Sequence, residues 1–395
     1  MFKIQLGPAI HVGVETRAGM FLSRADNAPG ANLAGQFGEG LCQKECGDRD
    51  EEEGHHATKG TIALNSAKVL LRRRGAPRNA LGSKPLRQRH SLNRQMEVSM
   101  YVIAGASGNT GRVVAEELLA RGQKVRVLGR SVERLLPLVG KGAEGFEVDL
   151  QDTAKLREAL AGAKAAYLLI PPHLGAPDFM AYQKETADSL SRAVEHSGIG
   201  YVVFLSSLGA EQPEGTGPIA GLHYAEDRLR KIQNLNLLAV RAAYFMENFY
   251  MSIPAVHQYG FLGGEVTPNV SIPMISTGDI GRYVADRLYN LDFKGKKVRE
   301  LLGHEDLTMT EAATIIGEAL GKPGLKYRRL DESTFRQVLK DAGISDSTAD
   351  LYLEMAGALS EGRITSTQPR TEANTTPTSL EQFARNQLSQ MQPTE

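Results

Sequence analysis

Apolar runs of five or six residues alternate with stretches of helical periodicity over residues 100–241. Short apolar runs between turn residues are typical of strands buried on both faces, and a period of 3.6 predicts amphipathic helices that cover them. The strands predicted in this way are residues 100–105, 124–130, 143–150, 163–172, 201–207 and 235–241. The predicted helices are residues 109–122, 131–140, 153–162, 178–198 and 223–234. This alternation predicts an α/β fold with a doubly wound parallel sheet, because each strand–helix–strand unit forms a right-handed crossover.

After Arg241 the alternation loosens, and the predicted elements become shorter and more mixed. Strands are expected within residues 261–276, 298–302 and 325–330, and helices at residues 279–291, 308–321, 331–342 and 346–360. Residues 362–378 are polar and weakly patterned, which predicts a loop, and Ser379 with Gln382 fits a capping box that begins a last helix. We therefore expect a Rossmann-type domain at 100–241, a smaller C-terminal α/β substrate lobe at 242–361, and a loop with a C-terminal helix at 362–395.

Residues 1–99 show no sustained period of two or 3.6, so we expect a disordered extension there. The working protein is hypothesised to begin at Met96 or Met100, because Met100 stands at the start of the first predicted strand. Cys42 and Cys46, followed by His55-His56, match no structural zinc spacing, and no metal is predicted.

Composition and charge exclude some classes of partner. Apolar residues make up 41% of the chain, which is enough for a substantial core. Net charge is zero, but residues 1–99 carry fifteen Lys and Arg against ten Asp and Glu, so the remainder is mildly acidic. A nucleic-acid-binding surface is expected to be basic, and we therefore expect no nucleic-acid partner.

The distribution of apolar residues and cysteines bears on where in the cell the protein is located. No apolar stretch approaches the roughly 18–20 residues that a membrane span requires, and the first residues lack the apolar core of a secretory signal. We expect no membrane partner and a cytoplasmic location. The only two cysteines lie before residue 100, so the α/β region has no thiol nucleophile and needs no disulfide.

Three glycines lie between the first predicted strand and the first predicted helix, at Gly105, Gly108 and Gly111. Gly105 permits a tight turn, and Gly108 lets a pyrophosphate approach the amides at the helix N-terminus, where the macrodipole favours negative charge. Gly111 allows close packing of the helix on the sheet. A glycine triplet in this strand–turn–helix context predicts dinucleotide binding, with an ordinary glycine-rich turn as the alternative.

The end of the second strand bears on which dinucleotide binds. An acidic residue about 20 positions after the glycines usually holds the ribose 2′-hydroxyl of NAD. Here the strand ends at Arg130, and no carboxylate follows until Glu133. A guanidinium suits the 2′-phosphate of NADP, so Arg130 predicts NADPH in preference to NADH, with Arg134 or Arg112 as helpers. The alternative is a surface arginine that begins a helix.

Two further strand ends are expected to line the ligand crevice of an open α/β sheet. Asp149 and Leu150 end the third predicted strand, and Ile170 and Pro171 end the fourth. Asp149 either holds the adenine side of the cofactor or begins the next helix, and the sequence leaves both open.

Several phrases together resemble one branch of a known superfamily. The form GxxGxxG, with Ser107, Asn109 and Thr110 among the glycines, resembles the short-chain dehydrogenase/reductase superfamily. VDLQD, FLSSLGA and VRAAYFMENF are similar to its atypical NmrA-like branch, and the C-terminal phrases look similar to bacterial NADPH-dependent quinone oxidoreductases of that branch. This resemblance covers roughly residues 100–388.

The resemblance implies NADPH binding at the strand ends and, for some members, hydride transfer to quinones. It also implies an alternative of another class, a non-catalytic NADP(H)-sensing regulator that binds a protein partner. The residues expected to contact the cofactor include the serine that ends the fifth strand, which is Ser206 or its neighbour Ser207. These residues are Gly105, Ser107, Gly108, Asn109, Thr110, Gly111, Arg130, Asp149, Leu150, Ile170, Pro171 and Ser206.

One departure from the superfamily concerns the proton donor. Many members use a Tyr-x-x-x-Lys pair, whereas this chain has Tyr224 with Arg228. Arg228 is able to lower the pKa of Tyr224 by charge, but an arginine cannot relay a proton. Tyr224 and His223 are the candidate catalytic residues, and the alternative for Tyr224 is a partly buried helix tyrosine.

Reduction of a quinone tolerates this departure, because the product anion is stabilised and the reaction depends mainly on positioning. Tyr244, Phe245 and Phe249 follow the sixth strand, where a flat apolar wall for the acceptor is expected. Asn248 is placed to donate to a quinone carbonyl. The alternative is that the aromatic residues pack between the domain and the lobe.

Overall fold

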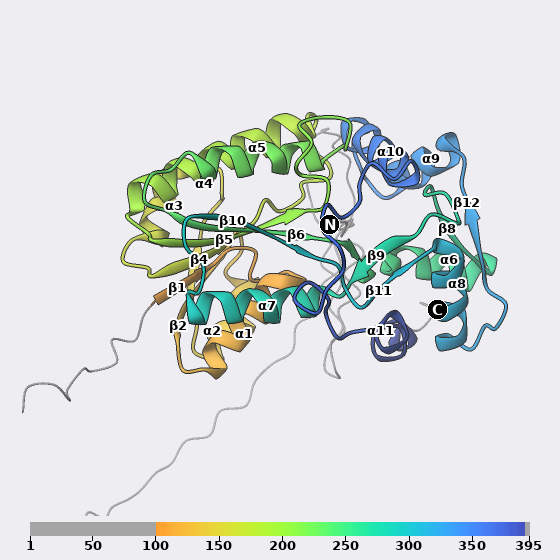
Figure 1. The fold of residues 1–395 in the computed structure, drawn as a ribbon, viewed down its shortest axis with the longest axis horizontal. Helices are drawn as coiled ribbons and strands as arrows, with labels where there is room; N and C mark the ends of the chain where they lie inside the picture. The colour runs from red at the N-terminus through yellow and green to blue at the C-terminus, as the bar shows by residue number, and fades with distance from the viewer. Residues whose placement is uncertain (1–99, 392–395) are drawn as a thin grey trace, which may run out of the picture. The chain divides into compact units, whose positions relative to one another are not determined.

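The computed structural model describes residues 100–391 of the chain (Figure 1). The predictions for residues 1–99, including the disordered extension and the Cys42–Cys46 pattern, lie outside the described residues. The described residues all belong to one compact unit.

A seven-stranded sheet forms the centre of the fold. Its strand order is β10-β6-β5-β4-β1-β2-β3, and every neighbouring pair is parallel. The strands are β1 (Met100–Ile103), β2 (Lys124–Gly129), β3 (Glu144–Glu147), β4 (Ala165–Leu168), β5 (Tyr201–Ser207), β6 (Asn236–Ala242) and β10 (Lys296–Leu301). The predicted doubly wound parallel sheet is therefore confirmed.

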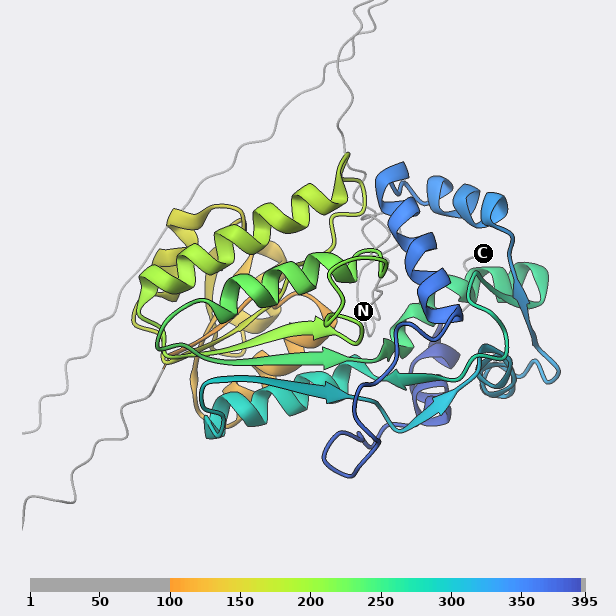
Figure 2. The same cartoon turned by 45° about the horizontal axis from the view of Figure 1, so that its top comes forward.

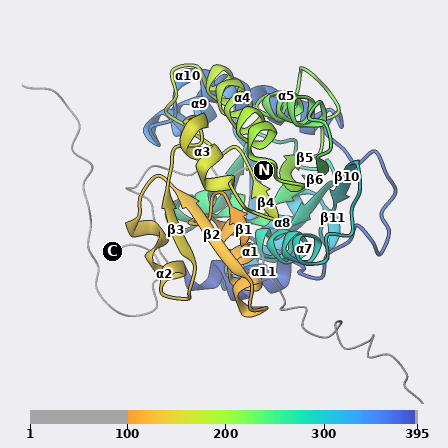
Figure 3. The same ribbon diagram turned by 90° about the vertical axis from the view of Figure 1, so that its left-hand side faces the viewer.

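Helices cover both faces of this sheet (Figures 1 and 3). One layer holds α3 (Thr153–Leu160), α4 (Phe179–Ser197) and α5 (Ile219–Arg230), and the other holds α1 (Asn109–Ala120), α2 (Leu136–Val139) and α7 (Thr277–Asn290). α2 is shorter than predicted, because a 3₁₀ turn (Glu133–Leu135) takes the first part of the segment. Burial on both faces explains why the central strands read as continuous apolar runs.

The predicted boundary after Arg241 requires one amendment. α7 and β10 lie in the part of the chain assigned to the lobe, yet α7 packs on α1 and β10 pairs with β6 in the main sheet. β10 is an edge strand whose first residues are exposed, so its sequence lacks the apolar run that marked the inner strands. The division into domain and lobe otherwise remains a prediction.

The remaining elements, which we call the lobe, form two small sheets with helices. Strands β11 (Glu305–Leu307), β9 (Ile272–Ile275) and β7 (Tyr244–Phe245) form one sheet, and β12 (Lys326–Arg329) pairs in parallel with β8 (Phe261–Gly264) in the other. The helices are η3 (Met246–Ser252), α6 (Ile253–Tyr259), α8 (Met309–Ala319), α9 (Glu332–Asp341), α10 (Asp346–Ser360), α11 (Leu380–Asn386) and η4 (Leu388–Gln390). The sequence did not predict β7, η3, α6 or β11, because each is short or irregular.

The C-terminal segment runs back along the domain before it ends in α11 (Figure 2), and two buried carboxylates hold it there. Glu300 on β10 accepts hydrogen bonds from Ser366, Thr367 and the amide of Gln368. Asp279 on α7 accepts from the amide and hydroxyl of Thr378, directly before α11. The predicted capping box of α11 is confirmed. These hydrogen bonds fix the path of the polar loop 362–378, which has no apolar core of its own.

A buried ion pair joins β6 to α5. The Arg241 side chain is 7% exposed and donates to both carboxylate oxygens of Glu226, at 3.0 and 2.9 Å, while the Glu226 side chain is 1% exposed. Arg230 and Ser206 donate to the same carboxylate. The buried charges of Arg241 and Glu226 are therefore paired and hydrogen-bonded. Removal of either side chain would leave the other charge buried without its partner, which lowers the free energy of unfolding.

We predict that Arg241→Ala lowers the free energy of unfolding by about 3 kcal/mol, because it leaves the Glu226 carboxylate buried with half its cationic partners. Denaturant unfolding followed by circular dichroism measures the loss. Arg336→Ala is the control, since Arg336 pairs with Glu332 and Asp350 on the surface and its removal should cost less than about 1 kcal/mol. Equal losses for the two variants would contradict a special role for the buried pair.

Candidate functional site

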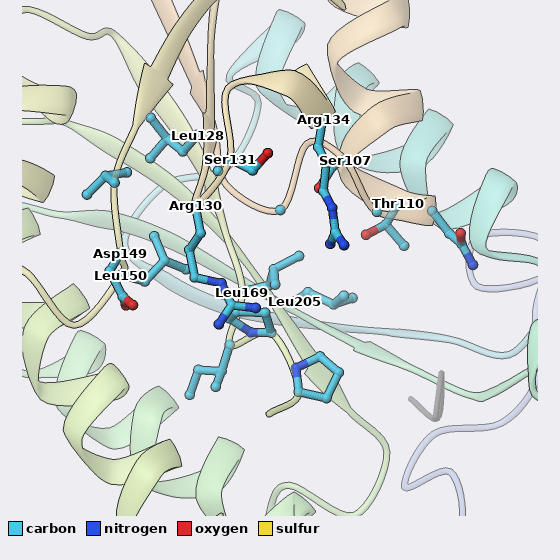
Figure 4. A pocket seen from close by; sticks show the side chains of 18 of the residues that line it. Ser107, Thr110, Leu128, Arg130, Ser131, Arg134, Asp149, Leu150, Leu169 and Leu205 are labelled. Atoms are coloured by element: carbon cyan, nitrogen blue, oxygen red, sulfur yellow. The ribbon is translucent and has the colours of Figure 1, made fainter. Parts of the chain in front are cut away.

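A cavity of about 510 Å³ opens at the carboxyl ends of the sheet strands, around the turn between β1 and α1 (Figure 4). All of the predicted cofactor residues line this cavity except Gly111 and Ser206. It also includes Pro172, which the sequence placed at the end of the fourth strand, and residues to which the sequence analysis gave no role, namely Leu128, Gly129, Ser131, Val148, Leu169, Tyr182, Leu205 and Thr277. The topological crevice expected of a doubly wound sheet is therefore present where the glycines lie.

The glycine turn has the geometry that the sequence predicted. Gly105 adopts a φ of +61°, and the Gly108 amide donates to the Gly105 carbonyl at 2.9 Å. Gly108 is the N-cap of α1, and no side chain caps the first turn of the helix. A Cβ on Gly111 would lie 2.4 Å from the Gly105 carbonyl oxygen, which is inside contact distance. Gly111 therefore acts by letting the helix approach the strand, without lining the cavity itself.

A buried tyrosine holds this turn against the neighbouring strand. Tyr167 on β4 is fully buried, and its hydroxyl donates to Thr110 Oγ1 at 2.8 Å. Burial raises the pKa of Tyr167 well above its ordinary value, so the hydroxyl stays protonated as a donor. The first turn of α1 is thus fixed to both β1 and β4.

Two arginines enter the cavity from the segment after β2. Arg130 and Arg134 line it, and within the described part of the chain neither guanidinium has a hydrogen bond or an ion pair (Figure 4). Arg112, the other predicted helper, does not line the cavity and pairs with Glu116 at 3.1 Å. Both arginines are exposed, and guanidinium groups without a protein partner are suited to bind an anion.

Tyr182 on α4 also lines the cavity. Its hydroxyl donates to the Pro171 carbonyl at 2.9 Å, and its ring meets His173 at 5.2 Å edge to face. Burial raises the pKa of Tyr182, while the charge of nearby Arg130 acts in the opposite direction. Tyr182 belongs to a helix with ordinary periodicity, so no sequence signal distinguished it from core.

Glu247 fixes the part of the cavity nearest the lobe. Its carboxylate accepts from the Thr277 amide at 3.0 and 3.1 Å and from the Thr277 hydroxyl at 2.5 Å. Thr277 begins α7 and lines the cavity, so Glu247 ties the segment after β6 to the N-terminus of that helix.

Ser206 does not reach the cavity, contrary to the prediction. It is fully buried, and its hydroxyl donates to Glu226 Oε1 at 2.5 Å. Successive residues of a strand point to opposite faces, and Leu205, the preceding residue, lines the cavity instead. The serine that the sequence favoured belongs to the buried ion-pair network.

The two candidate catalytic residues also lie elsewhere. The Tyr224 hydroxyl donates to Asp188 on α4 at 3.0 Å, and Arg228 forms an ion pair with the same oxygen. His223 bonds to the Ala210 carbonyl at 2.9 Å. Burial and the bond to Asp188 raise the pKa of Tyr224, and the opposing charge of Arg228 does not prevail. Neither residue lines the cavity, and the catalytic assignment of Tyr224 and His223 stays a prediction.

The predicted acceptor wall is only partly assembled at the cavity. Phe245 lines it, whereas Tyr244 lines a second cavity of about 20 Å³ beside Ser207 and Met355. The Tyr244 ring packs against Phe249 at 5.9 Å. Asn248 is 8% exposed, and its role toward an acceptor stays a prediction.

Two kinds of feature are absent from residues 100–391. No helix there is long and apolar enough to cross a membrane. No group of three or more His, Cys, Asp or Glu side chains among those residues is arranged to hold a metal ion.

The chain is similar to several known proteins. The model of the NmrA-like family matches residues 98–384. Quinone oxidoreductase 2 of Escherichia coli (strain K12) is 24% identical over 269 residues, which cover 67% of this chain and 89% of that protein. The structure of an NADPH-dependent quinone oxidoreductase from E. coli, complexed with NADPH, gives a TM-score of 0.63 at 21% identity over 73% of this chain and 99% of that one.

The triphenylmethane reductase of Citrobacter sp., complexed with NADP(H), gives a TM-score of 0.61 at 20% identity over 73% of this chain and 99% of that chain. At these identities, the likeness to the solved structures establishes a shared fold.

We predict that Gly111→Ala destabilises the protein by about 2 kcal/mol, because the added Cβ forces α1 away from the β1 turn. The same displacement should weaken dinucleotide binding by at least about tenfold, which is roughly the loss of one hydrogen bond to a charged group. Denaturant unfolding and a dinucleotide titration measure the two effects.

Gly357→Ala provides the matched control, since Gly357 lies within α10 with open space around its Cβ position. It should be neutral or stabilise by up to about 1 kcal/mol, as alanine favours helix more than glycine does. A Gly111→Ala protein that binds dinucleotide as the unaltered chain does would contradict the assigned role of the close approach.

Proposed function

The chain belongs to the NmrA-like family, and from that premise we propose that it is an NADPH-dependent oxidoreductase that transfers a hydride to a quinone or similar carbonyl acceptor. The observation that carries the proposal is the pair Arg130 and Arg134, whose guanidinium groups enter the cavity without partners in the described chain. They stand at the end of β2, where a 2′-phosphate is expected to lie in this type of sheet.

The lining residues fit the other parts of the cofactor. The uncapped amides at the start of α1 and the bare Gly108 suit a pyrophosphate. Asp149, Leu150 and Tyr182 form the expected adenine side, next to Arg130. Leu205, Phe245 and Thr277 also line the cavity, and we assign them to the nicotinamide end of the cofactor. A Cβ at Gly108 would lie 3.2 Å from the Gly105 carbonyl oxygen, so a side chain there would crowd the turn itself.

The acceptor assignment rests on chemistry and on named relatives. When bound, NADPH supplies a hydride, and an acceptor that is flat and apolar needs mainly to be held against it. Phe245 offers an aromatic surface at that end of the cavity. The relative from E. coli is named a quinone oxidoreductase, which supports a quinone as the acceptor class.

We predict that Arg130→Ala weakens NADPH binding by roughly 10- to 100-fold, as expected for loss of hydrogen bonds between charged groups, and leaves NADH binding nearly unchanged. Fluorescence or calorimetric titration with both dinucleotides measures the difference. Arg134→Ala should show the same selectivity with a smaller effect.

Arg112→Ala is the control for nonspecific loss of positive charge, because Arg112 lies outside the cavity and pairs with Glu116. It should change neither affinity by more than about twofold, given the small energies of surface pairs. Equal losses of NADPH and NADH affinity in Arg130→Ala would refute the assignment of Arg130 to the 2′-phosphate.

Turnover separates the proposal from the sensor alternative, which stays a prediction. We expect the full chain to oxidise NADPH in the presence of a small benzoquinone, followed by the loss of absorbance of the reduced nicotinamide. Tight NADPH binding without turnover on a panel of quinones would favour an NADP(H)-sensing protein instead.

A further inference from the structure

Two threonine hydroxyls in the cavity differ in what they can offer a ligand. A threonine hydroxyl has one hydrogen to donate and two lone pairs that accept, so its protein partner decides which of these remains for a ligand. Thr110 and Thr277 both line the cavity and are 6% and 3% exposed. Each hydroxyl bonds to a buried residue, Tyr167 or Glu247, and the two bonds run in opposite directions.

The Thr110 hydroxyl keeps its hydrogen for a ligand. Its Oγ1 accepts the hydrogen of the Tyr167 hydroxyl at 2.8 Å, and its own hydrogen therefore remains available. Thr110 stands in the first turn of α1, beside the uncapped amides, where an anion is expected. The hydroxyl has the polarity that a phosphate oxygen requires.

The Thr277 hydroxyl has the opposite polarity. The Thr277 amide donates to the two carboxylate oxygens of Glu247, at 3.0 and 3.1 Å, so both oxygens act as acceptors. The hydroxyl donates to one of them at 2.5 Å, a length typical of a bond to a charged oxygen. Its hydrogen is thus used inside the protein, and a ligand that meets this hydroxyl meets lone pairs alone.

The strand order separates Thr277 from the expected 2′-phosphate site. Arg130 follows β2, whereas Leu205 belongs to β5, and β1 and β4 stand between those two strands. Phe245 pairs with Ile275 in the β7–β9 ladder, and Thr277 follows closely at the start of α7. A dinucleotide with its pyrophosphate at the β1–α1 turn and its 2′-phosphate at Arg130 would extend its nicotinamide toward β4 and β5. This order supports the assignment of Phe245 and Thr277 to the nicotinamide end.

The groups of NADPH differ in hydrogen-bond polarity. Phosphate oxygens accept, ribose hydroxyls either donate or accept, and the carboxamide NH₂ of the nicotinamide donates only. Lone pairs with the Glu247 carboxylate behind them would repel a phosphate, and they suit the carboxamide NH₂.

We propose that Thr277 Oγ1 accepts a hydrogen bond from the carboxamide NH₂ of the nicotinamide, and that Glu247 is the positioning residue that gives the hydroxyl this polarity. Both roles rest on the proposed function, because they presuppose that NADPH binds in this cavity. An anchored carboxamide fixes the rotation of the nicotinamide ring about its bond to the ribose. Thr277 therefore helps to decide which face of the ring is turned to the acceptor.

Dinucleotide analogues test this polarity without turnover. The acetylpyridine analogue of NADP⁺ has a methyl group in place of the NH₂, whereas the thionicotinamide analogue keeps the NH₂ and alters only the carbonyl oxygen. Thr277→Val removes the hydroxyl and nearly keeps the shape of the side chain. In calorimetric titrations of the full chain, it should weaken NADP⁺ and the thionicotinamide analogue by about five- to tenfold, as for loss of one neutral hydrogen bond. It should weaken the acetylpyridine analogue by less than about twofold.

Three further threonine variants provide matched comparisons. Thr110→Val should weaken all three dinucleotides alike, because it acts on the pyrophosphate that they share. Thr277→Ser keeps the hydroxyl and should keep the preference for dinucleotides that carry the NH₂. Thr314→Val is the control on an exposed part of α8, where the hydroxyl donates to the Thr310 carbonyl of its own helix, and it should change no affinity.

Glu247→Gln tests the positioning residue. A glutamine is able to place its NH₂ against Thr277 Oγ1 and its oxygen against the Thr277 amide, which releases the threonine hydrogen toward the cavity. The variant should lose the preference for NADP⁺ over the acetylpyridine analogue. Its melting temperature shows whether it is folded, and the contrast of Thr277→Val with Thr277→Ser decides the proposal where it is not.

The titrations distinguish the two proposals. An unaltered chain that binds neither NADPH nor any of the three NADP⁺ forms contradicts the proposed function. An unaltered chain that binds them, together with a Thr277→Val protein that is unimpaired or equally impaired with all three, overturns only the contact with the carboxamide. A folded Glu247→Gln protein that keeps the full preference overturns the role of Glu247.

Discussion

The close approach of α1 to the end of β1 is the constraint on which the site depends. At Gly111 the helix comes so near the Gly105 carbonyl that no side chain fits between them. The Tyr167–Thr110 bond holds the same turn against β4. Together these contacts aim the uncapped start of α1 at the cavity, and the strand ends that carry Arg130 and Asp149 are placed around it. The anion-binding character of the site follows from this packing.

Several segments of the chain are linked to one another by hydrogen bonds to buried carboxylates. Glu226 joins α5 to β6, Glu247 joins the segment after β7 to α7, and Asp279 and Glu300 hold the C-terminal loop. Each carboxylate has several donors, which is the condition under which buried charge is tolerated. These bonds link segments distant in sequence, and they hold the segment after β7 and the C-terminal loop to the main sheet and its helices.

The sequence was informative where a local pattern decides the structure, and silent where distant partners decide it. Apolar runs and glycine spacing predicted the parallel sheet and the β1–α1 turn, and the position of Arg130 predicted a guanidinium in the cavity. Ser206 and Tyr224 stood in plausible local contexts, but their partners, Glu226 and Asp188, are 20 and 36 residues away. Strand β10 was assigned to the lobe because its exposed edge carries lysines and an arginine.

The main sheet and the lobe line different parts of the cavity, and this division bears on which acceptors the site can take. The dinucleotide side consists of strand ends and one helix start, all fixed by the main sheet. From the lobe, Phe245 lines the cavity, and the nearby Glu247 is held to the start of α7 by its hydrogen bonds to Thr277. Substitution near Phe245 can therefore alter this part of the cavity without moving the glycine turn. A fold of this kind can keep one cofactor site while the residues on its lobe side differ.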